Sequence, residues 1–398
     1  MKDVVIVDAV RTPIGRYKGA LKHVRPDDMA SEVIKGIVNR QPKLPVEEIE
    51  EVIFGNANGA GEENRNVARM AALLADLPIN VSGTTINRLC GSGLDAVNMA
   101  ARSIMVGDGD IYIAGGTESM TRAPFVMAKP SKEYPRGNME LMDTTIGWRF
   151  TNPKLEAMYG ADSMPQTAEN VAKRYDISRE AQDEFAYHSQ MKAKAAVENN
   201  LFEDEIIPIS YQQRGETVTV DKDEHPRPNT SMEKLSKLRP IFEGGTVTAG
   251  NASGVNDGAS AVLLMSAEKA DELGIIPMAR FVSSGTAGVE PAYMGLGPIH
   301  ATRKAIKRAG ITIDAIDLVE LNEAFASQSL ECMKQLELNQ EIVNVNGGAI
   351  AFGHPLGASG ARILTTLLHE MRRRNVKTGL ATMCIGVGQG IATVVENI

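Results

Sequence analysis

Two short sequences, Cys90-Gly91-Ser92-Gly93 and Gly357-Ala358-Ser359-Gly360, occupy equivalent places in two halves of this chain. The same number of residues separates Val52 from Cys90 as separates Val319 from Gly357. Each sequence is followed by an apolar pattern with the period of a helix. Sequence identity between the halves is otherwise low, but the shared spacing and order of these segments predict a duplicated unit.

Strand-like and helix-like segments alternate in the same order in both halves. In the first half, strands are predicted at 4–10, 49–54 and 111–116, and a helix at 29–39. In the second half, the matching strands are predicted at 279–285, 316–321 and 380–388, and the helix at 300–309. This alternation implies an α/β fold with largely parallel sheets, and such folds place their chemistry where strands lead into helices.

An insertion between the two halves breaks this pattern. Prolines are frequent at its start, a polar helix is predicted over 167–199, and a polar run follows at 221–228. Long insertions usually serve as lids or binding loops, so we expect a domain that covers the substrate. The small residues of 246–257 suit a loop that returns to the first half near a ligand. The expected division is an N-terminal half of residues 1–122 and 240–270, an inserted domain of 123–239, and a C-terminal half of 271–398.

Composition and charge exclude several classes of protein. The chain of 398 residues has a formal net charge of −8, which argues against nonspecific binding of nucleic acid. Its three cysteines are far apart, so a disulfide framework is not expected and a reducing compartment fits best. No apolar run approaches the length that spans a bilayer. The apolar start reads as a buried strand and the last residues are not a peroxisomal signal, so we expect a cytoplasmic protein.

Two cysteines in glycine-rich turns are candidates for chemistry. Cys90 precedes a helix predicted to begin near Ser92, and the positive end of a helix lowers the pKa of a thiol. Cys384 lies in Cys384-Ile385-Gly386-Val387-Gly388, where glycines expose amides that can stabilise an oxyanion. The alternative for both is a buried structural cysteine. Zinc is a further alternative, but no Cys-x-x-Cys pair is present and no metal site is predicted. Cys332 is expected in the core.

His354 and Asn322 are candidates for proton transfer and for stabilising negative charge. His354 lies in Gly353-His354-Pro355, where proline keeps the preceding residue out of a regular helix. Histidine is a natural base for a cysteine nucleophile, and the alternative is a turn histidine with ordinary partners. Asn322 can donate from its amide to a developing negative charge, or it can cap the helix that follows. Glu323 is expected to be ionised and to orient its neighbours.

Taken together, the order and spacing of these motifs resemble the thiolase family over essentially the whole chain. The blocks that carry the resemblance are 11–15, 90–93, 115–120, 246–254, 322–325, 346–349, 353–360 and 384–388. The resemblance implies duplicated half-domains that form a five-layered αβαβα core, with an inserted covering-loop domain. It also implies reversible acyl transfer between acyl-CoA and acetyl-CoA, a role in fatty acid metabolism, and homodimers or homotetramers. Coenzyme A and acetyl-CoA would be substrates, and no cofactor would be bound permanently.

The resemblance assigns roles to individual residues. Cys90 would be the acylated nucleophile, His354 its activating base, and Cys384 the acid or base that moves the α-proton of acetyl-CoA. Asn322, through a water molecule, and His354 would form one oxyanion hole. The amides of Cys90 and Gly386 would form the other. The positions expected around coenzyme A are Arg227, Phe242, Ala249, Ser253, Met294, Ala324 and Phe325.

The inserted segment departs from one branch of this family. Ser163-Met164-Pro165 stands where many acetoacetyl-CoA thiolases have His-Met-Gly. The stretches 143–150, 162–171 and 224–228 look more like the 3-oxoadipyl-CoA thiolases of aromatic degradation. We therefore expect an acyl pocket unlike the biosynthetic type. Arg149 is expected to be a surface or structural arginine, and the alternative is that it faces a substrate carboxylate.

The choice of substrate and two other functions remain to be compared with this interpretation. The substrate of a thiolase with these motifs is either acetoacetyl-CoA or 3-oxoadipyl-CoA. A ketoacyl synthase also uses a cysteine but pairs it with two histidines or with histidine and asparagine, so the second thiol at Cys384 favours a thiolase. A thiolase-like lipid-binding protein without catalysis is the alternative from a different class. It is disfavoured because Cys90, Asn322, His354 and Cys384 are all present.

Overall fold

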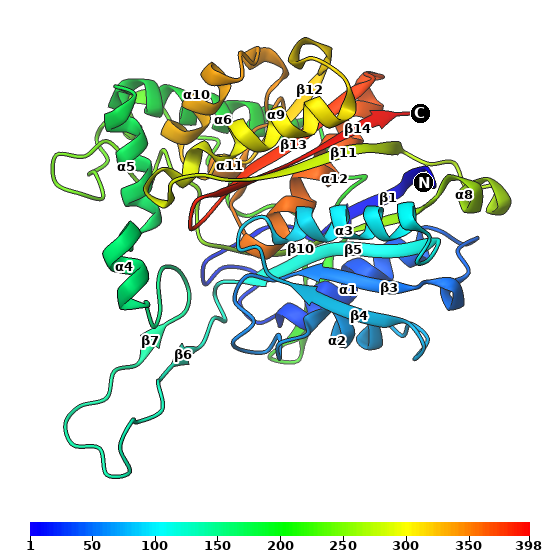
Figure 1. The fold of residues 1–398 in the computed structure, drawn as a ribbon, viewed down its shortest axis with the longest axis horizontal. Coiled ribbons are helices and arrows are strands. Elements are labelled where there is room, and N and C mark those ends of the chain that lie inside the picture. Colours follow the sequence, from blue (N-terminus) through cyan, green and yellow to red (C-terminus); the bar gives the residue numbers. More distant parts are fainter.

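Two helices, α3 (Ser92–Val106) and α12 (Leu356–Arg374), form the central layer of the structure, a computed structural model that describes residues 1–398. They pack against each other and against strands of both halves. In Figure 1 they lie between two sheet regions, and further helices cover the outer face of each region. The five-layered αβαβα arrangement expected from the sequence is therefore confirmed.

The strands of both halves join in one ten-stranded sheet. The first half contributes, in spatial order, β4 (Ser82–Ile86), β3 (Glu51–Gly55), β5 (Ile111–Ser119), β10 (Asn256–Ser266) and β1 (Val4–Arg11), with β2 (Gly15–Arg16) beside β10. The second half continues from β1 with β11 (Ala279–Gly288), β14 (Gln389–Asn397), β13 (Thr378–Ile385) and β12 (Leu318–Leu321). The pairing of β1 with β11 is short, with Val5 opposite Arg280 and Ile6 opposite Ala279.

The expectation of largely parallel sheets is wrong. Only the pairs β3–β4, β3–β5 and β12–β13 are parallel, and the other pairings of the sheet are antiparallel. The antiparallel pairings arise because the last strand of each half, β14 or β10, runs opposite in direction to the strand beside it. A tight turn at 386–388 joins β13 to β14, and a hairpin can only join antiparallel strands. β10 arrives from the far side of the inserted segment and also runs antiparallel to β5.

Amphipathic helices cover the outer faces. α1 (Pro26–Asn39) and α2 (Val67–Leu74) pack on the first half, and α9 (Gly297–Ala309) and α10 (Ala326–Gln335) lie over the second. Met29, Val33, Ile34 and Ile37 recur at helical spacing along α1 and are all fully buried. α8 (Ala267–Leu273) connects β10 to β11. The predicted strand and helix order is thus found in both halves.

The inserted segment forms its own small elements, and Figure 1 shows its first part, residues 125–174, along one side of the molecule. These are β6 (Phe125–Val126), β7 (Met142–Asp143), α4 (Pro153–Tyr159), α5 (Met164–Arg174), α6 (Arg179–Glu198), β8 (Ile209–Gln213), β9 (Glu216–Val220) and α7 (Met232–Ser236). The single polar helix predicted over 167–199 is two helices. Asp176 has a φ of +53°, and the Ser178 hydroxyl accepts from the Ala181 amide to cap α6. α6 packs against α10 and against α11 (Ala349–Phe352) of the second half.

No helix of this structure combines the length and the apolar character that a membrane crossing requires.

The close contact of α3 with α12 gives the first prediction. A Cβ atom at Gly93 would lie 2.7 Å from the Gly357 carbonyl oxygen and 2.9 Å from the Ala361 nitrogen, which are backbone atoms that cannot rotate away. We expect Gly93→Ala to lower the free energy of unfolding by about 1–3 kcal/mol, measured by urea denaturation. Val106→Ala, at an exposed position of the same helix, should change it by less than about 0.5 kcal/mol. Wild-type stability of the Gly93 variant would contradict this account of the packing.

Candidate active site

The Cys90 thiol lies in a turn between β4 and α3. Leu89 has a φ of +47°, a left-handed conformation that turns the chain just ahead of Cys90. The Ser92 hydroxyl accepts from the Arg88 amide at 2.8 Å and donates to the Leu89 carbonyl at 2.6 Å, which closes the turn. Cys90 is therefore held half-buried at the start of α3, as the sequence predicted.

The ionisation of Cys90 differs from the expectation. Burial raises the pKa of this thiol; the amide of Gly386 opposes the shift, and the negative charge of Glu118 adds to it. The predicted lowering of the pKa by the helix is wrong because the loss of hydration is the larger effect. The thiol is thus protonated at neutral pH and needs a base to become a nucleophile.

His354 is positioned to be that base. Its amide donates to Asn256 Oδ1 at 3.0 Å, which fixes the backbone between α11 and α12. Its Nδ1 lies 2.6 Å from the hydroxyl oxygen of Ser359. That hydroxyl donates its own proton to the Pro355 carbonyl at 2.9 Å, so it accepts from Nδ1–H. The lone pair of the imidazole is therefore on Nε2.

The Nε2 atom of His354 is buried and has no hydrogen-bond partner. Burial, with a smaller effect from the positive charge of Arg362, lowers the pKa of His354 to about 3. The imidazole is neutral at physiological pH and its free lone pair can accept a proton. The sequence left two interpretations of His354 open, a base and a turn histidine with ordinary hydrogen-bond partners. The unpartnered Nε2 atom favours the base.

Helix packing brings His354 to the Cys90 turn. Gly93 at the start of α3 meets Gly357 at the start of α12, and each lies three residues after Cys90 or His354. Leu356, next to Pro355, lines the same pocket as Cys90. In the repeat the counterpart of Cys90 is Gly357, so Cys90 and His354 are different positions of the two units that the helix contact brings together.

Asn322 follows the last residue of β12. Both polar atoms of its side chain, Oδ1 and Nδ2, are buried without a hydrogen-bond partner. Phe325, not Asn322, occupies the N-cap position of α10, which excludes the capping role that the sequence left open. A buried amide without partners costs free energy unless a ligand or water satisfies it, and such groups are characteristic of binding sites.

Glu323, beside Asn322, has a different environment. Its carboxylate accepts from the Ser189 hydroxyl at 2.7 Å, the Asn344 amide at 2.8 Å and the Ile350 backbone at 3.2 Å. Burial raises the pKa of Glu323, and these bonds oppose the shift. The side chain joins α6, β12 and α11, so the orienting role that the sequence predicted fits its contacts.

Cys384 lies near the end of β13, where Thr382 pairs with Leu321 of β12. This register brings Asn322 beside the Cys384 end of the strand. Burial is the main reason that the pKa of Cys384 is raised well above its ordinary value, and ionisation of Cys90, followed by that of Cys332, would raise it further. The two thiols, expected at one composite site, therefore do lie together. Cys332 is buried in the core, as predicted.

A pocket of about 390 Å³ opens onto Cys90. Its walls are largely apolar and include Met120, Ile146, Trp148 and Met164. Only two ionisable side chains other than Cys90 line it, Glu118 and Arg149. Trp148 donates from its indole to the Asp162 carbonyl at 3.1 Å, which joins two loops of the inserted segment at the pocket wall. The structure thus places Arg149 in the pocket with Cys90 and excludes a purely surface arginine.

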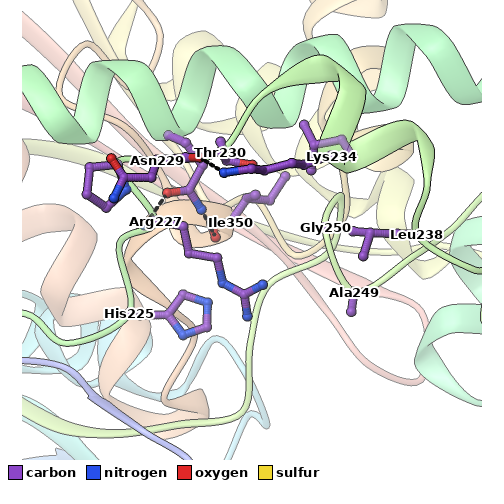
Figure 2. A pocket seen from close by; sticks show the side chains of 12 residues that line it. His225, Arg227, Asn229, Thr230, Lys234, Leu238, Ala249, Gly250 and Ile350 are labelled. Atoms are coloured by element: carbon purple, nitrogen blue, oxygen red, sulfur yellow. Dashed lines mark hydrogen bonds between the residues drawn. The ribbon is translucent and has the colours of Figure 1, made fainter.

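A second pocket, of about 320 Å³, lies between the inserted segment and the 246–255 loop. Figure 2 shows the Arg227 guanidinium extending into the space between His225 and Ala249. Lys234 adds a second cation, and its ammonium group donates to the Asn229 carbonyl at 2.6 Å. The pocket is therefore positively charged.

The positions expected around coenzyme A divide among different environments. Arg227 and Ala249 line the second pocket. Met294, Ala324 and Phe325 are buried in one cluster with Cys384, and the Ser253 amide donates to the Ala324 carbonyl at 3.0 Å. Phe242 lines neither pocket. The structure therefore brings six of these positions to the second pocket or to the surroundings of Cys384, and leaves Phe242 apart from both pockets.

Sequence reasoning missed three positioning residues. Ser359 sets the tautomer of His354, Asn256 holds its backbone, and Glu118 accepts from the amides of Ala57 and Gly357 at 2.8 Å each. Burial raises the pKa of Glu118 to about 7. Glu118 and Ser359 fall inside quoted motifs, but their role depends on contacts between segments far apart in the chain.

Comparison with known proteins gives matches over the whole chain. Residues 4–268 match the family described as "Thiolase, N-terminal domain", and residues 275–397 match "Thiolase, C-terminal domain". The chain is 54% identical to the 3-oxoadipyl-CoA/3-oxo-5,6-dehydrosuberyl-CoA thiolase of Escherichia coli, and 52% identical to a beta-ketoadipyl-CoA thiolase of Acinetobacter baylyi, over 100% of each chain. The crystal structure of the Bacillus anthracis acetyl-CoA acetyltransferase superposes with a TM-score of 0.94 at 41% identity, covering 100% of this chain and 99% of that one.

The bond between Ser359 and His354 gives the second prediction. Ser359→Ala leaves Nδ1 without an acceptor, so the imidazole can adopt the tautomer that protonates Nε2. A positioned base contributes about 10²–10⁴-fold, and we expect kcat to fall roughly 10–100-fold with little change in KM. Steady-state kinetics of thioester cleavage measures this. Ser31→Ala, which removes a buried serine on α1, is the matched control and should retain full activity. An unchanged kcat for Ser359→Ala would show that this hydrogen bond does not set the tautomer.

Proposed function

This chain belongs to the thiolase family, and we propose that it cleaves 3-oxoadipyl-CoA with coenzyme A to give succinyl-CoA and acetyl-CoA. Its activity as a thiolase is acyl transfer between CoA thioesters. The observation that carries the more specific proposal is Arg149, a half-buried guanidinium in the pocket that Cys90 lines.

Arg149 is suited to bind a carboxylate. Its recorded hydrogen bonds both come from Nη2, which donates to Asn58 Oδ1 at 3.0 Å and to the Asn58 carbonyl at 3.4 Å. Nε and Nη1 donate to no protein group and are left for a ligand, and a guanidinium N–H forms a charge-assisted hydrogen bond to a carboxylate. An acetoacetyl group would leave this cation unused, whereas a 3-oxoadipyl group carries a terminal carboxylate. The names of the two relatives described above support the same substrate, in preference to the general fatty acid metabolism expected from the sequence.

The first half-reaction begins at Cys90. Nε2 of His354 accepts the thiol proton, and the thiolate attacks the 3-oxo carbon. The amides of Cys90 and Gly386 stabilise the resulting oxyanion, and the effect of the Gly386 amide on the pKa of Cys90 supports this position. The bond between C2 and C3 then breaks, which leaves the succinyl group on Cys90 and the enolate of acetyl-CoA.

The enolate is stabilised and protonated by the remaining groups. The unpartnered Asn322 amide, through a water molecule, and the protonated His354 donate toward the thioester oxygen that carries the charge. Cys384, a protonated thiol because burial raises its pKa, gives its proton to the α-carbon. Coenzyme A then takes the succinyl group from Cys90, so the scheme is ping-pong.

Coenzyme A is proposed to enter past the second pocket. Arg227 and Lys234 line it, and the ligand carries several phosphate charges that these cations attract. Met294, Ala324 and Phe325 are buried in one cluster with Cys384, and this cluster is proposed as an apolar wall for the pantetheine arm.

Substrate preference tests the proposed function directly. We expect wild-type kcat/KM to be higher for 3-oxoadipyl-CoA than for acetoacetyl-CoA. Arg149→Gln should lower the value for 3-oxoadipyl-CoA by roughly 10–100-fold, since a bond to a charged group contributes about 1.5–3 kcal/mol. The value for acetoacetyl-CoA should change less than about threefold. Arg136→Gln, at an exposed arginine of the same segment outside this pocket, is the control. A clear wild-type preference for acetoacetyl-CoA would exclude the proposal.

Replacement of Asn322 tests the oxyanion hole. Asn322→Ala removes the amide that holds the water molecule donating to the enolate oxygen, and loss of a donor in an oxyanion hole costs about 10²–10³-fold in kcat. We expect that loss with KM nearly unchanged, because the bond strengthens as charge develops. Mass spectrometry should still detect the acyl adduct on Cys90 after incubation with an acyl-CoA. Loss of that adduct along with activity would instead place Asn322 in the binding of substrate.

A further inference from the structure

The acyl-enzyme of the proposed reaction has a chemical weakness. A succinyl group on Cys90 carries a free carboxylate two methylene groups away from the thioester carbonyl. One carboxylate oxygen can attack that carbonyl carbon, forming a C–O bond and a five-membered cyclic anhydride. The C–S bond breaks, and the Cys90 sulfur leaves as a thiolate and takes a proton. Water then opens the anhydride to succinate, so the thioester is lost without transfer to coenzyme A.

Such internal attacks are fast because both reacting groups are on one short chain. Effective molarities for well-oriented intramolecular reactions reach about 10⁵–10⁸ M. The conformation of the acyl group controls how readily this reaction occurs. An extended chain holds the carboxylate away from the carbonyl carbon, whereas a folded chain brings the two together. A thiolase that forms succinyl-Cys90 therefore gains from a group that keeps the chain extended.

Arg149 is fixed where it can do this. Its Nη2 donates to Asn58 Oδ1, and the Asn58 amide in turn donates to the Thr144 hydroxyl at 3.0 Å. The Asn58 backbone donates to Glu118 Oε1 at 3.3 Å, which ties this loop to β5. Thr144 is itself buried, and its hydroxyl donates to the Pro124 carbonyl at 2.6 Å. The guanidinium thus has a fixed position in the pocket wall and no acidic side chain neutralises it there.

Glu118, the other ionisable side chain of the pocket, influences the Cys90 thiol. Glu118 is the acidic side chain whose negative charge raises the pKa of Cys90, and it is fully buried. Its carboxylate is held by the amides of Ala57 and Gly357. Burial raises the pKa of Glu118 to about 7, so part of the protein carries this charge at neutral pH, and the ionised form repels a substrate carboxylate that folds back toward the Cys90 sulfur. The two ionisable side chains of the pocket therefore favour the same extended conformation.

We propose that Arg149, anchored by Asn58, holds the terminal carboxylate of succinyl-Cys90 away from its own thioester and so protects the acyl-enzyme from self-cleavage. This inference rests on 3-oxoadipyl-CoA being the substrate. It assigns Arg149 a role after substrate recognition, during the lifetime of the acyl-enzyme. Asn58 is a positioning residue that acts through Arg149.

The lifetime of the acyl-enzyme tests the proposal. The wild type and Arg149→Gln are loaded with succinyl-CoA, coenzyme A is removed, and the adduct on Cys90 is followed by intact mass. The glutamine can still donate to Asn58 but lacks the charge. We expect the succinyl adduct of the variant to decay at least tenfold faster than that of the wild type. The acetyl adduct, loaded from acetyl-CoA, has no carboxylate and should decay at the same rate in both proteins. Arg136→Gln should behave as the wild type.

A second measurement does not depend on isolating the adduct. During turnover of 3-oxoadipyl-CoA, an enzyme that transfers every succinyl group to coenzyme A forms equal amounts of acetyl-CoA and succinyl-CoA. In Arg149→Gln and in Asn58→Ala, which removes the anchor but keeps the arginine, acetyl-CoA should exceed succinyl-CoA and free succinate should account for the difference. Each variant tests the proposal if the other fails to fold.

The outcomes separate this inference from the proposed function. Equal lifetimes of the succinyl adduct in the wild type and Arg149→Gln, or equal shortening of the succinyl and acetyl adducts, would overturn the protective role. Equal amounts of acetyl-CoA and succinyl-CoA in both variants would also overturn the protective role. The substrate assignment would stand in each of these cases. Failure of the wild type to cleave 3-oxoadipyl-CoA would overturn the proposed function itself.

Discussion

The contact between the backbones of α3 and α12 is the constraint on which the site depends. Gly93 and Gly360 have no side chains, so the helices approach until the Gly93 Cα faces the Gly357 carbonyl and the Gly360 Cα faces the Leu94 amide. Any larger side chain at these points would separate the two helix starts. Cys90 and His354 each lie three residues before this contact, in turns too short to absorb a displacement. The duplicated glycines are therefore a structural requirement of a site formed between the two halves.

Burial determines the protonation states at this site. It raises the pKa values of both thiols and lowers that of His354, so all three groups are uncharged before substrate binds. Arg362 contributes to the neutral state of His354, because its buried guanidinium lies on α12, the helix that follows His354, and its ion pair with Glu320 is as long as 3.7 Å. Proton transfer then begins between neutral groups, and the negative charges formed later meet donors that have no other partner.

The inserted segment completes the pocket in which the catalytic turns of the two halves act. Thr144, Trp148 and Arg149 come from this segment, yet they complete the pocket that Cys90 lines. Asn58 of the first half connects to them through side-chain hydrogen bonds. A pocket assembled in this way can change its acyl specificity through residues of the insertion while the catalytic turns stay the same.

The sequence by itself determined the duplicated order of elements, the positions of Cys90, His354 and Cys384 in turns, and the family, because these depend on local pattern and on spacing along the chain. It did not predict the antiparallel pairings, the break between α5 and α6, or the raised pKa of Cys90. Nor could it show that Asn322 lacks partners, that Ser359 sets the histidine tautomer, or that Arg149 shares a pocket with Cys90. Each of these depends on which distant segments meet and on how much water they exclude, and only the tertiary structure decides that.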